Sequence, residues 1–341
     1  MPESTAIATV HAIVSLVNIV GNSLVCVIIK RNRDMRTPIN CLLVNLAIAD
    51  IMYAAFIAPE VILRIAITHP DGLAGTFLCK LVTAAIFAWI GAFSSMVTLL
   101  VIAFERYFAV IYPYENRRLT TGKLKKAIAG SWIFAVIINL PLFVVVTVKD
   151  NTCVNIWVYG ENWKHRAYDM VWNSAALLTM VLMAGLYSRI VYTLWFKRDV
   201  HDNQLAFQQR GVIRMRKRAT LMVVTVTVLF GICWVSDITA HSIDYYTSHR
   251  ISTETYLTIH TLILLNTAVN PFVYTLISHN FREKMKGMIY CRYPGSTDSW
   301  SPTTRIPPSR RKSSERELCP DQHIETGGHV NVVAIRFNQP M

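Results

Sequence analysis

The chain has 341 residues, of which 53% are hydrophobic and only 16% are charged. This scarcity of charge, with a mean hydropathy of +0.35, excludes an ordinary water-soluble globular protein. The formal net charge of +13 does not indicate nucleic-acid binding, because the basic residues lie in short segments between apolar runs and not on one soluble face.

Apolar runs long enough to cross a bilayer recur along the whole sequence, since roughly 20 apolar residues span the hydrocarbon as a helix. Lipid offers no partner to backbone N–H and C=O groups, so each run is predicted to be helical. The sequence therefore predicts an all-α membrane protein, a seven-transmembrane helix bundle. The expected helices are 8–30, 38–64, 76–104, 124–148, 168–196, 212–245 and 252–277.

Lysine and arginine set the expected orientation of this bundle. They are concentrated in the gaps after the first, third and fifth helices, whereas the alternate gaps hold few basic residues and several acids. The positive-inside bias then places the N-terminus outside and the C-terminus in the cytoplasm of a multi-pass membrane protein. No signal peptide is expected ahead of the first helix.

The segment after the seventh helix is expected to lie on the membrane surface. Residues 279–290 form an amphipathic pattern with Phe281 and Met285 on its apolar face. Cys291 follows, and either acylation or a plain juxtamembrane cysteine fits its position. We expect a membrane domain over 1–291 and a disordered tail over 292–341, where Ser, Thr, Pro and Arg dominate.

Of the seven cysteines, Cys79 and Cys153 are the two expected on the oxidising outer side. They are predicted to form one disulfide, with two unpaired thiols as the alternative. Polar residues stranded inside the apolar helices are functional candidates. At mid-membrane depth these are expected to form one hydrated cluster around Asp50: Asn22, Asp50, Ser95, Asn266 and Asn270.

Short motifs occur in a fixed order along the helices: Gly21-Asn22, 45–50 (NLAIAD), Glu105-Arg106-Tyr107, Trp132, Tyr187, 230–234 (FGICW) and 270–274 (NPFVY). This ordered set resembles the rhodopsin-like (class A) family of G-protein-coupled receptors over about residues 10–291. The resemblance implies a receptor, not an enzyme, that binds an extracellular ligand and activates a heterotrimeric G protein. It also implies arrestin-like proteins, receptor kinases and membrane lipid as partners.

The resemblance further assigns roles to individual residues. For G-protein coupling and activation these are Glu105, Arg106, Tyr107, Tyr187, Phe230, Trp234, Asn270, Pro271 and Tyr274. Arg106 would be held by Glu105 at rest and released toward the G protein when the sixth helix swings outward. A sodium ion would be held by Asp50, Ser95, Asn266 and Asn270; a protonated Asp50 in a water network is the alternative.

The chain also departs from the family pattern. Ser236 stands where the family usually has proline, so the sixth helix lacks a proline kink. The cytoplasmic end of that helix carries Arg216 and Arg218 but no carboxylate, so the clasp that holds Arg106 across helices in some members cannot form. Two extra residues between Cys79 and Arg106 leave the start of the third helix undefined.

The outer halves of the helices indicate the class of ligand. Ala88, beside Trp89, replaces the aspartate with which amine receptors hold their ligand, and the seventh helix has no lysine for retinal. The residues expected to line the ligand site are Glu60, Arg64, Ala88, Trp89, Asp237, His241, Asp244 and His260. Three carboxylates against one arginine predict a cationic ligand, and residues 187–195 resemble the peptide-binding branch of the family.

Three alternatives remain open at this stage. Glu60 can pair with Arg64, and Asp237 with His241 or His260, which would leave no free charge for a ligand. A receptor of the same family for a small non-peptide ligand is the second alternative. A small membrane transporter is the third, although the two halves of the chain show no internal repeat.

Overall fold

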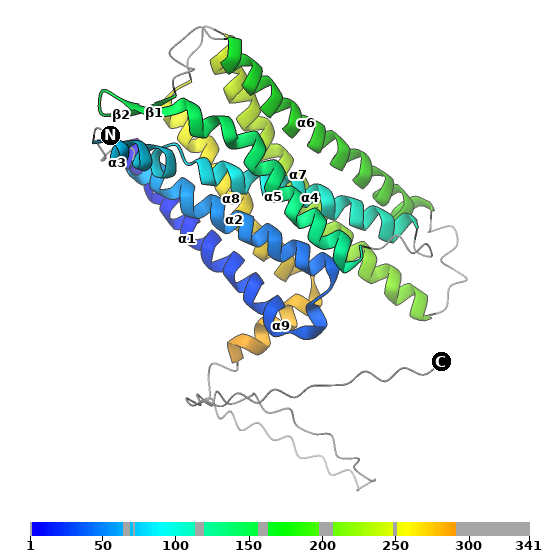
Figure 1. Ribbon diagram of the computed structural model, residues 1–341. Helices are drawn as coiled ribbons and strands as arrows, with labels where there is room; N and C mark the ends of the chain where they lie inside the picture. Colours follow the sequence, from blue (N-terminus) through cyan, green and yellow to red (C-terminus); the bar gives the residue numbers. More distant parts are fainter. Residues whose placement is uncertain are drawn as a thin grey trace, which may run out of the picture. The chain divides into compact units, whose positions relative to one another are not determined.

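The protein is described here by a computed structural model that covers residues 2–63, 69–70, 72–112, 119–155, 163–197, 207–247 and 251–290. Within these residues, seven helices are long and apolar enough to cross a membrane. The predicted seven-helix fold is therefore confirmed. The described residues up to Lys286 form one compact unit, in which the long helices run side by side (Figure 1). Cys291 and the tail lie outside the described residues.

The first two long helices are α1 (Pro2–Arg31) and α2 (Pro38–Leu63), joined by a 3₁₀ turn, η1 (Arg33–Met35). Proline suits the first position of α2, because its fixed φ matches the helix and its missing N–H would have no partner there. The amide of Asn40 donates to the carbonyl of Met35 at 2.6 Å and ties the turn to α2.

The third span is broken, unlike the continuous helix expected over 76–104. It consists of α3 (Leu73–Leu78), a π-helical turn η2 (Cys79–Thr83) and α4 (Ile86–Ile111). Ala85 joins the turn to α4 in the left-handed conformation, with φ 47°, and is buried. A π turn holds more residues than an α turn, so η2 and Ala85 take up the two extra residues before Arg106.

A β-hairpin follows α5 (Thr121–Val145) and was not predicted. Its strands are β1 (Val146–Lys149) and β2 (Thr152–Asn155), paired antiparallel. Asp150 and Asn151 form the two-residue turn with φ of 51° and 55°, a left-handed geometry that these two residue types tolerate. The fourth span therefore ends before the expected limit at 148.

The hairpin carries the predicted disulfide. Cys153 on β2 is bonded to Cys79 in η2, with 5.3 Å between their Cα atoms. His69 fixes the same region, because its backbone N–H donates to the carbonyl of Asn151 at 3.1 Å and its ring contacts the hydroxyl of Thr83 at 2.7 Å. The hairpin is thus held over the start of the third span.

The remaining helices are α6 (Trp163–Val191), which continues as a π turn η3 (Tyr192–Lys197), α7 (Phe207–Tyr246), α8 (Thr253–Ile277) and α9 (His279–Tyr290). Ser252 caps α8 by accepting a hydrogen bond from the N–H of Thr255 at 3.2 Å. The short helix predicted over 279–290 is present as α9. Its Phe281 is buried, as its position on the apolar face predicts.

The third span forms the centre of the bundle, since α4 packs against α2, α5 and α6, while α8 packs against α1 and α7. Gly91 allows the close contact with α2, because a Cβ atom there would lie 2.7 Å from the carbonyl oxygen of Ala49. Helix α7 is continuous without a proline. The hydroxyl of Ser236 donates to the carbonyl of Ile232 at 3.1 Å, a contact that bends helices slightly.

We name the two ends of the bundle by what they carry. The disulfide end holds Cys79 and Cys153, together with the hairpin (Figure 1). The Arg106 end is the opposite one, where α4 approaches its last turn and α9 begins.

Candidate functional site

Two buried carboxylates in the disulfide half of the bundle each lie beside a histidine. On α7, Oδ1 of Asp237 is 3.7 Å from Nε2 of His241, and the aspartate side chain is 0% exposed. On α2, Oε2 of Glu60 lies 4.0 Å from Nδ1 of His260, which belongs to α8. Both separations suit ion pairs when the imidazoles are protonated, but neither is a hydrogen bond.

Aromatic rings connect these two acid–histidine pairs. The ring of Trp89 on α4 meets His260 edge to face at 5.4 Å and Trp172 on α6 at 5.7 Å. Trp172 in turn stacks on Trp234 of α7 at 5.4 Å. Tyr256 on α8 lies between the two histidines, at 5.4 Å from His241. We call Trp89, Trp172, Trp234 and Tyr256 the aromatic cluster, whose electron-rich faces suit a cation.

The structure therefore brings together most of the residues predicted to bind the ligand: Glu60, Trp89, Asp237, His241 and His260. Ala88 is buried in α4 beside Trp89 and has no polar side chain to offer. Arg64 lies outside the described residues. The backbone of Asp244 belongs to α7, but its side chain is outside the described part of the chain.

The site also contains residues that were not predicted, chiefly Asp169 and Trp172 on α6. Asp169 is buried and accepts a hydrogen bond from the amide of Asn173 at 3.0 Å. It lies close enough to Asp237 and His241 to interact with both electrostatically. The three- and four-residue spacing of Asp169, Trp172 and Asn173 places them on one helix face, and this pattern was the available signal.

Acidic side chains outnumber imidazoles among the buried groups of this region. Three carboxylates, from Glu60, Asp169 and Asp237, are buried in this region; Asp237 lies beside the imidazole of His241, and Glu60 lies beside that of His260. An uncompensated buried carboxylate is costly in free energy. The arrangement can therefore neutralise a cationic group that enters the site.

A second polar site lies at mid-bundle around Asp50, which is completely buried. Its two carboxylate oxygens accept hydrogen bonds from the hydroxyl of Ser95 at 2.9 Å and from the amide of Asn270 at 2.7 Å. Asn266 lies one turn before Asn270, and its buried Oδ1 has no hydrogen-bond partner among the described residues. This set of oxygen atoms is of the kind that hard cations prefer.

The residues with implied roles in activation connect these sites to the Arg106 end. Phe230 stacks on Trp234 at 5.3 Å, one turn closer to that end of α7. Arg106 forms an ion pair with the neighbouring Glu105, as the resemblance implies for the resting state. The other members of the set are buried or half-buried in the bundle: Tyr107, Tyr187, Asn270, Pro271 and Tyr274.

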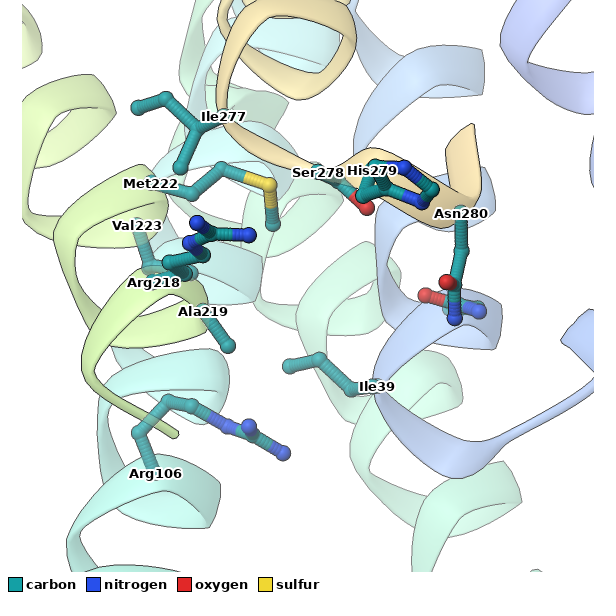
Figure 2. A pocket seen from close by; sticks show the side chains of 11 residues that line it. Ile39, Arg106, Arg218, Ala219, Met222, Val223, Ile277, Ser278, His279 and Asn280 are labelled. Carbon is teal, nitrogen blue, oxygen red and sulfur yellow. The ribbon is translucent and has the colours of Figure 1, made fainter. Parts of the chain in front are cut away.

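A cavity of about 230 Å³ opens at the Arg106 end (Figure 2). Arg106 and Arg218 line it from α4 and α7, and Ser278, His279 and Asn280 line it from the start of α9. Met222 and Ile277 form part of its apolar wall. The cavity is therefore a candidate contact site for a partner that binds this end of the bundle.

Comparison with known proteins adds a family to these observations. The family described as "7 transmembrane receptor (rhodopsin family)" matches residues 21–274. The chain is 27% identical to the pyroglutamylated RF-amide peptide receptor of Rattus norvegicus over 318 residues, which cover 84% of this chain and 70% of the relative.

Other relatives are receptors for different peptides. The chain is 26% identical to the allatostatin-A receptor of Bombyx mori, with 82% of this chain and 78% of that protein covered. It is 28% identical to the substance-K receptor of Canis lupus familiaris, with coverages of 83% and 75%.

Proposed function

The chain belongs to the rhodopsin family of seven-transmembrane receptors, and from this membership we propose that it binds an extracellular peptide and activates a heterotrimeric G protein. It is a multi-pass plasma-membrane receptor and not an enzyme. The observation that carries the peptide proposal is the pair of buried carboxylates, Asp237 and Glu60, on either side of the aromatic cluster. Three relatives that bear the names of peptide receptors support it.

The chemistry of the site indicates what kind of peptide fits. A guanidinium or ammonium group would be neutralised by Asp237 and Glu60, since charge-assisted hydrogen bonds to buried carboxylates are strong. An aromatic side chain of the ligand would pack against Trp89 or Tyr256. We therefore expect a peptide that carries a cationic and an aromatic residue close together. Ala88 leaves room at the position where amine receptors place their aspartate.

Transduction would run from this site along α7. A ligand that contacts Trp172 or His241 bears on Trp234, which stacks on Phe230. A shift of these rings would move the part of α7 that carries Arg218 away from α4. Arg106 would then leave Glu105 and contact the G protein, keeping its charge throughout because guanidinium does not deprotonate.

Membership of the rhodopsin family also leads us to propose an orientation, a bound ion and further partners. We expect the disulfide end to face outside and the Arg106 end to face the cytoplasm. Asp50, Ser95, Asn266 and Asn270 would hold a sodium ion, which would neutralise the buried carboxylate of the inactive receptor. Arrestin-like proteins and receptor kinases would act on the serine- and threonine-rich tail, and Cys291 would add a lipid contact if acylated.

A peptide screen tests this proposal. Amidated and free peptides are applied to membranes that contain the receptor and a G protein, and nucleotide exchange is measured. An active peptide should lose its potency when its cationic residue is replaced by the neutral isostere citrulline. An agonist that keeps its potency without any cationic group would contradict the proposed ligand class.

A further inference from the structure

The cavity at the Arg106 end has an unusual charge. Two guanidinium groups, from Arg106 and Arg218, line it from α4 and α7 (Figure 2), and no carboxylate is among the described residues that line it. Glu105 pairs with Arg106 but is not part of the cavity wall. Arg218 is exposed to solvent, and the Glu105 carboxylate offsets part of the charge of Arg106, so the cavity keeps a positive side that can attract an anion.

The start of α9 adds positive potential to the same cavity. The first N–H groups of a helix lack partners within it and form the positive end of its dipole. Ser278, directly before α9, satisfies one of these groups, because its hydroxyl accepts from the N–H of Phe281 at 3.4 Å. His279 and Asn280 of the first turn line the cavity opposite the two arginines (Figure 2).

The rest of the wall is apolar. Ile39 of α2, Met222 and Val223 of α7, and Ile277 at the end of α8 all border the cavity. Met222 and Val223 are buried, so this wall belongs to the bundle interior and not to a surface patch. The cavity thus combines a cationic side with an apolar side. A ligand that contacts both sides must be negatively charged at one end and apolar at the other.

We propose that this cavity binds an amphipathic organic anion. Its carboxylate or phosphate group would bridge Arg106 and Arg218, and its alkyl part would pack against Met222 and Ile277. Guanidinium groups bind such head groups through paired, charge-assisted hydrogen bonds. The bound anion supplies the negative charge that the described part of α7 lacks here, and so holds α4 and α7 together.

This placement makes the anion an inhibitor of signalling. A ligand that binds the closed arrangement better than the open one shifts the population toward the closed one. The G protein and the anion should therefore oppose each other's binding. Only this consequence rests on the proposed function, because binding of the anion needs no G protein.

Binding is tested on the purified full-length receptor in phosphatidylcholine nanodiscs. Thermal unfolding is followed by tryptophan fluorescence with octanoate, octanol, octylamine or acetate at equal concentrations. Octanoate should raise the midpoint by about 2–4 °C near saturation, and the other three probes should not. Nanodiscs that contain oleate distinguish a membrane source, since they should show the shift without a soluble probe if the anion enters from the bilayer.

Matched variants locate the site. Arg218→Gln should abolish the octanoate shift, whereas Lys286→Gln, which removes an exposed cation of α9 outside the cavity wall, should keep it. An equal shift in Arg218→Gln and the unmodified receptor would show that octanoate acts through the bilayer and would overturn the proposal. An equal shift with octanol or acetate would overturn it as well.

Nucleotide exchange separates this inference from the proposed function. Octanoate should lower basal exchange by about fivefold or more in the unmodified receptor. Arg218→Glu places a carboxylate beside Arg106, so it should give low basal exchange that octanoate does not change. If no G protein responds to any variant but the midpoint shifts follow the pattern above, the coupling proposal fails and the anion site stands. Normal coupling without the midpoint shift refutes the anion site.

Discussion

Asp237 and His241 lie one turn apart on α7 with 3.7 Å between the carboxylate and the imidazole, yet neither oxygen of Asp237 accepts a hydrogen bond from the described residues. Buried polar atoms nearly always have a hydrogen-bond partner. The two oxygens of Asp237 are therefore available to accept hydrogen bonds from the N–H groups of a ligand. Internal pairing with His241 can lower the cost of burial without occupying those positions. The site is therefore suited to a cationic ligand even though each acid has a histidine beside it.

The break in the third span predicts an unusual response to glycine. Ala85 has a positive φ, which costs an alanine about 1 kcal/mol or more and costs glycine little. Ala85→Gly should leave the free energy of unfolding unchanged or raise it by up to about 1 kcal/mol. The control Ala84→Gly, at a helical φ of −84°, should lower it by about 0.5–1 kcal/mol. Equal losses in thermal unfolding would contradict the left-handed connection.

The disulfide should make a large contribution to stability. Replacing both Cys79 and Cys153 by serine removes a cross-link between residues 74 positions apart, which typically costs about 2–4 kcal/mol. The unfolding midpoint should fall accordingly. Cys233→Ser serves as the control, because Cys233 is free in the structure. A double variant as stable as this control would refute the prediction.

Arg106→Ala should abolish nucleotide exchange while agonist affinity changes little, because Arg106 lies at the opposite end of the bundle from the aromatic cluster. Surface expression is measured alongside. Arg33→Ala, which removes an exposed cation of the η1 turn, should signal normally. Full signalling by a well-expressed Arg106→Ala receptor would contradict the assigned role.

Asp50→Asn should remove any dependence of agonist affinity on sodium, because it removes the charge that would bind the ion. The measurement is agonist binding at constant ionic strength, with sodium exchanged for a large organic cation. Asp34→Asn, at an exposed acid that pairs with Lys284, should keep the dependence. A sodium response that persists in Asp50→Asn would place the ion elsewhere.

The number of helices and their order follow directly from the sequence, because bilayer thickness sets the length of each apolar run and the hydrocarbon forbids unpaired backbone groups. The break at Ala85 does not follow. The extra residues before Arg106 signalled an irregularity, but the third span is apolar throughout, so periodicity could not locate it. The β-branched run Val146-Thr147-Val148 before Asp150 and Asn151 is typical of a hairpin strand. It is also apolar, and for that reason the helix was expected to continue to residue 148.

The candidate sites were predictable to different degrees. The stripe that contains Trp234, Asp237 and His241 is visible in the three- and four-residue spacing of one helix. Asp169 and Trp172 show the same spacing near the disulfide end of α6, but their importance depends on their contact with α7, which is a tertiary relationship. The sequence showed that α7 carries no carboxylate near Arg218. It did not show the cavity itself, because the cavity depends on where α9 begins relative to α4 and α7.

Agonist affinity after charge reversal at Asp237 and at Glu60 tests the placement of the ligand site most directly. Glu254→Lys, at an exposed acid in the first turn of α8, corrects for any long-range change of potential. Asp237→Lys and Glu60→Lys should each weaken binding of the identified peptide by about tenfold or more relative to this control, or roughly 1.4 kcal/mol. If both variants bind it within about threefold of the control, roughly 0.7 kcal/mol, the ligand site is not here.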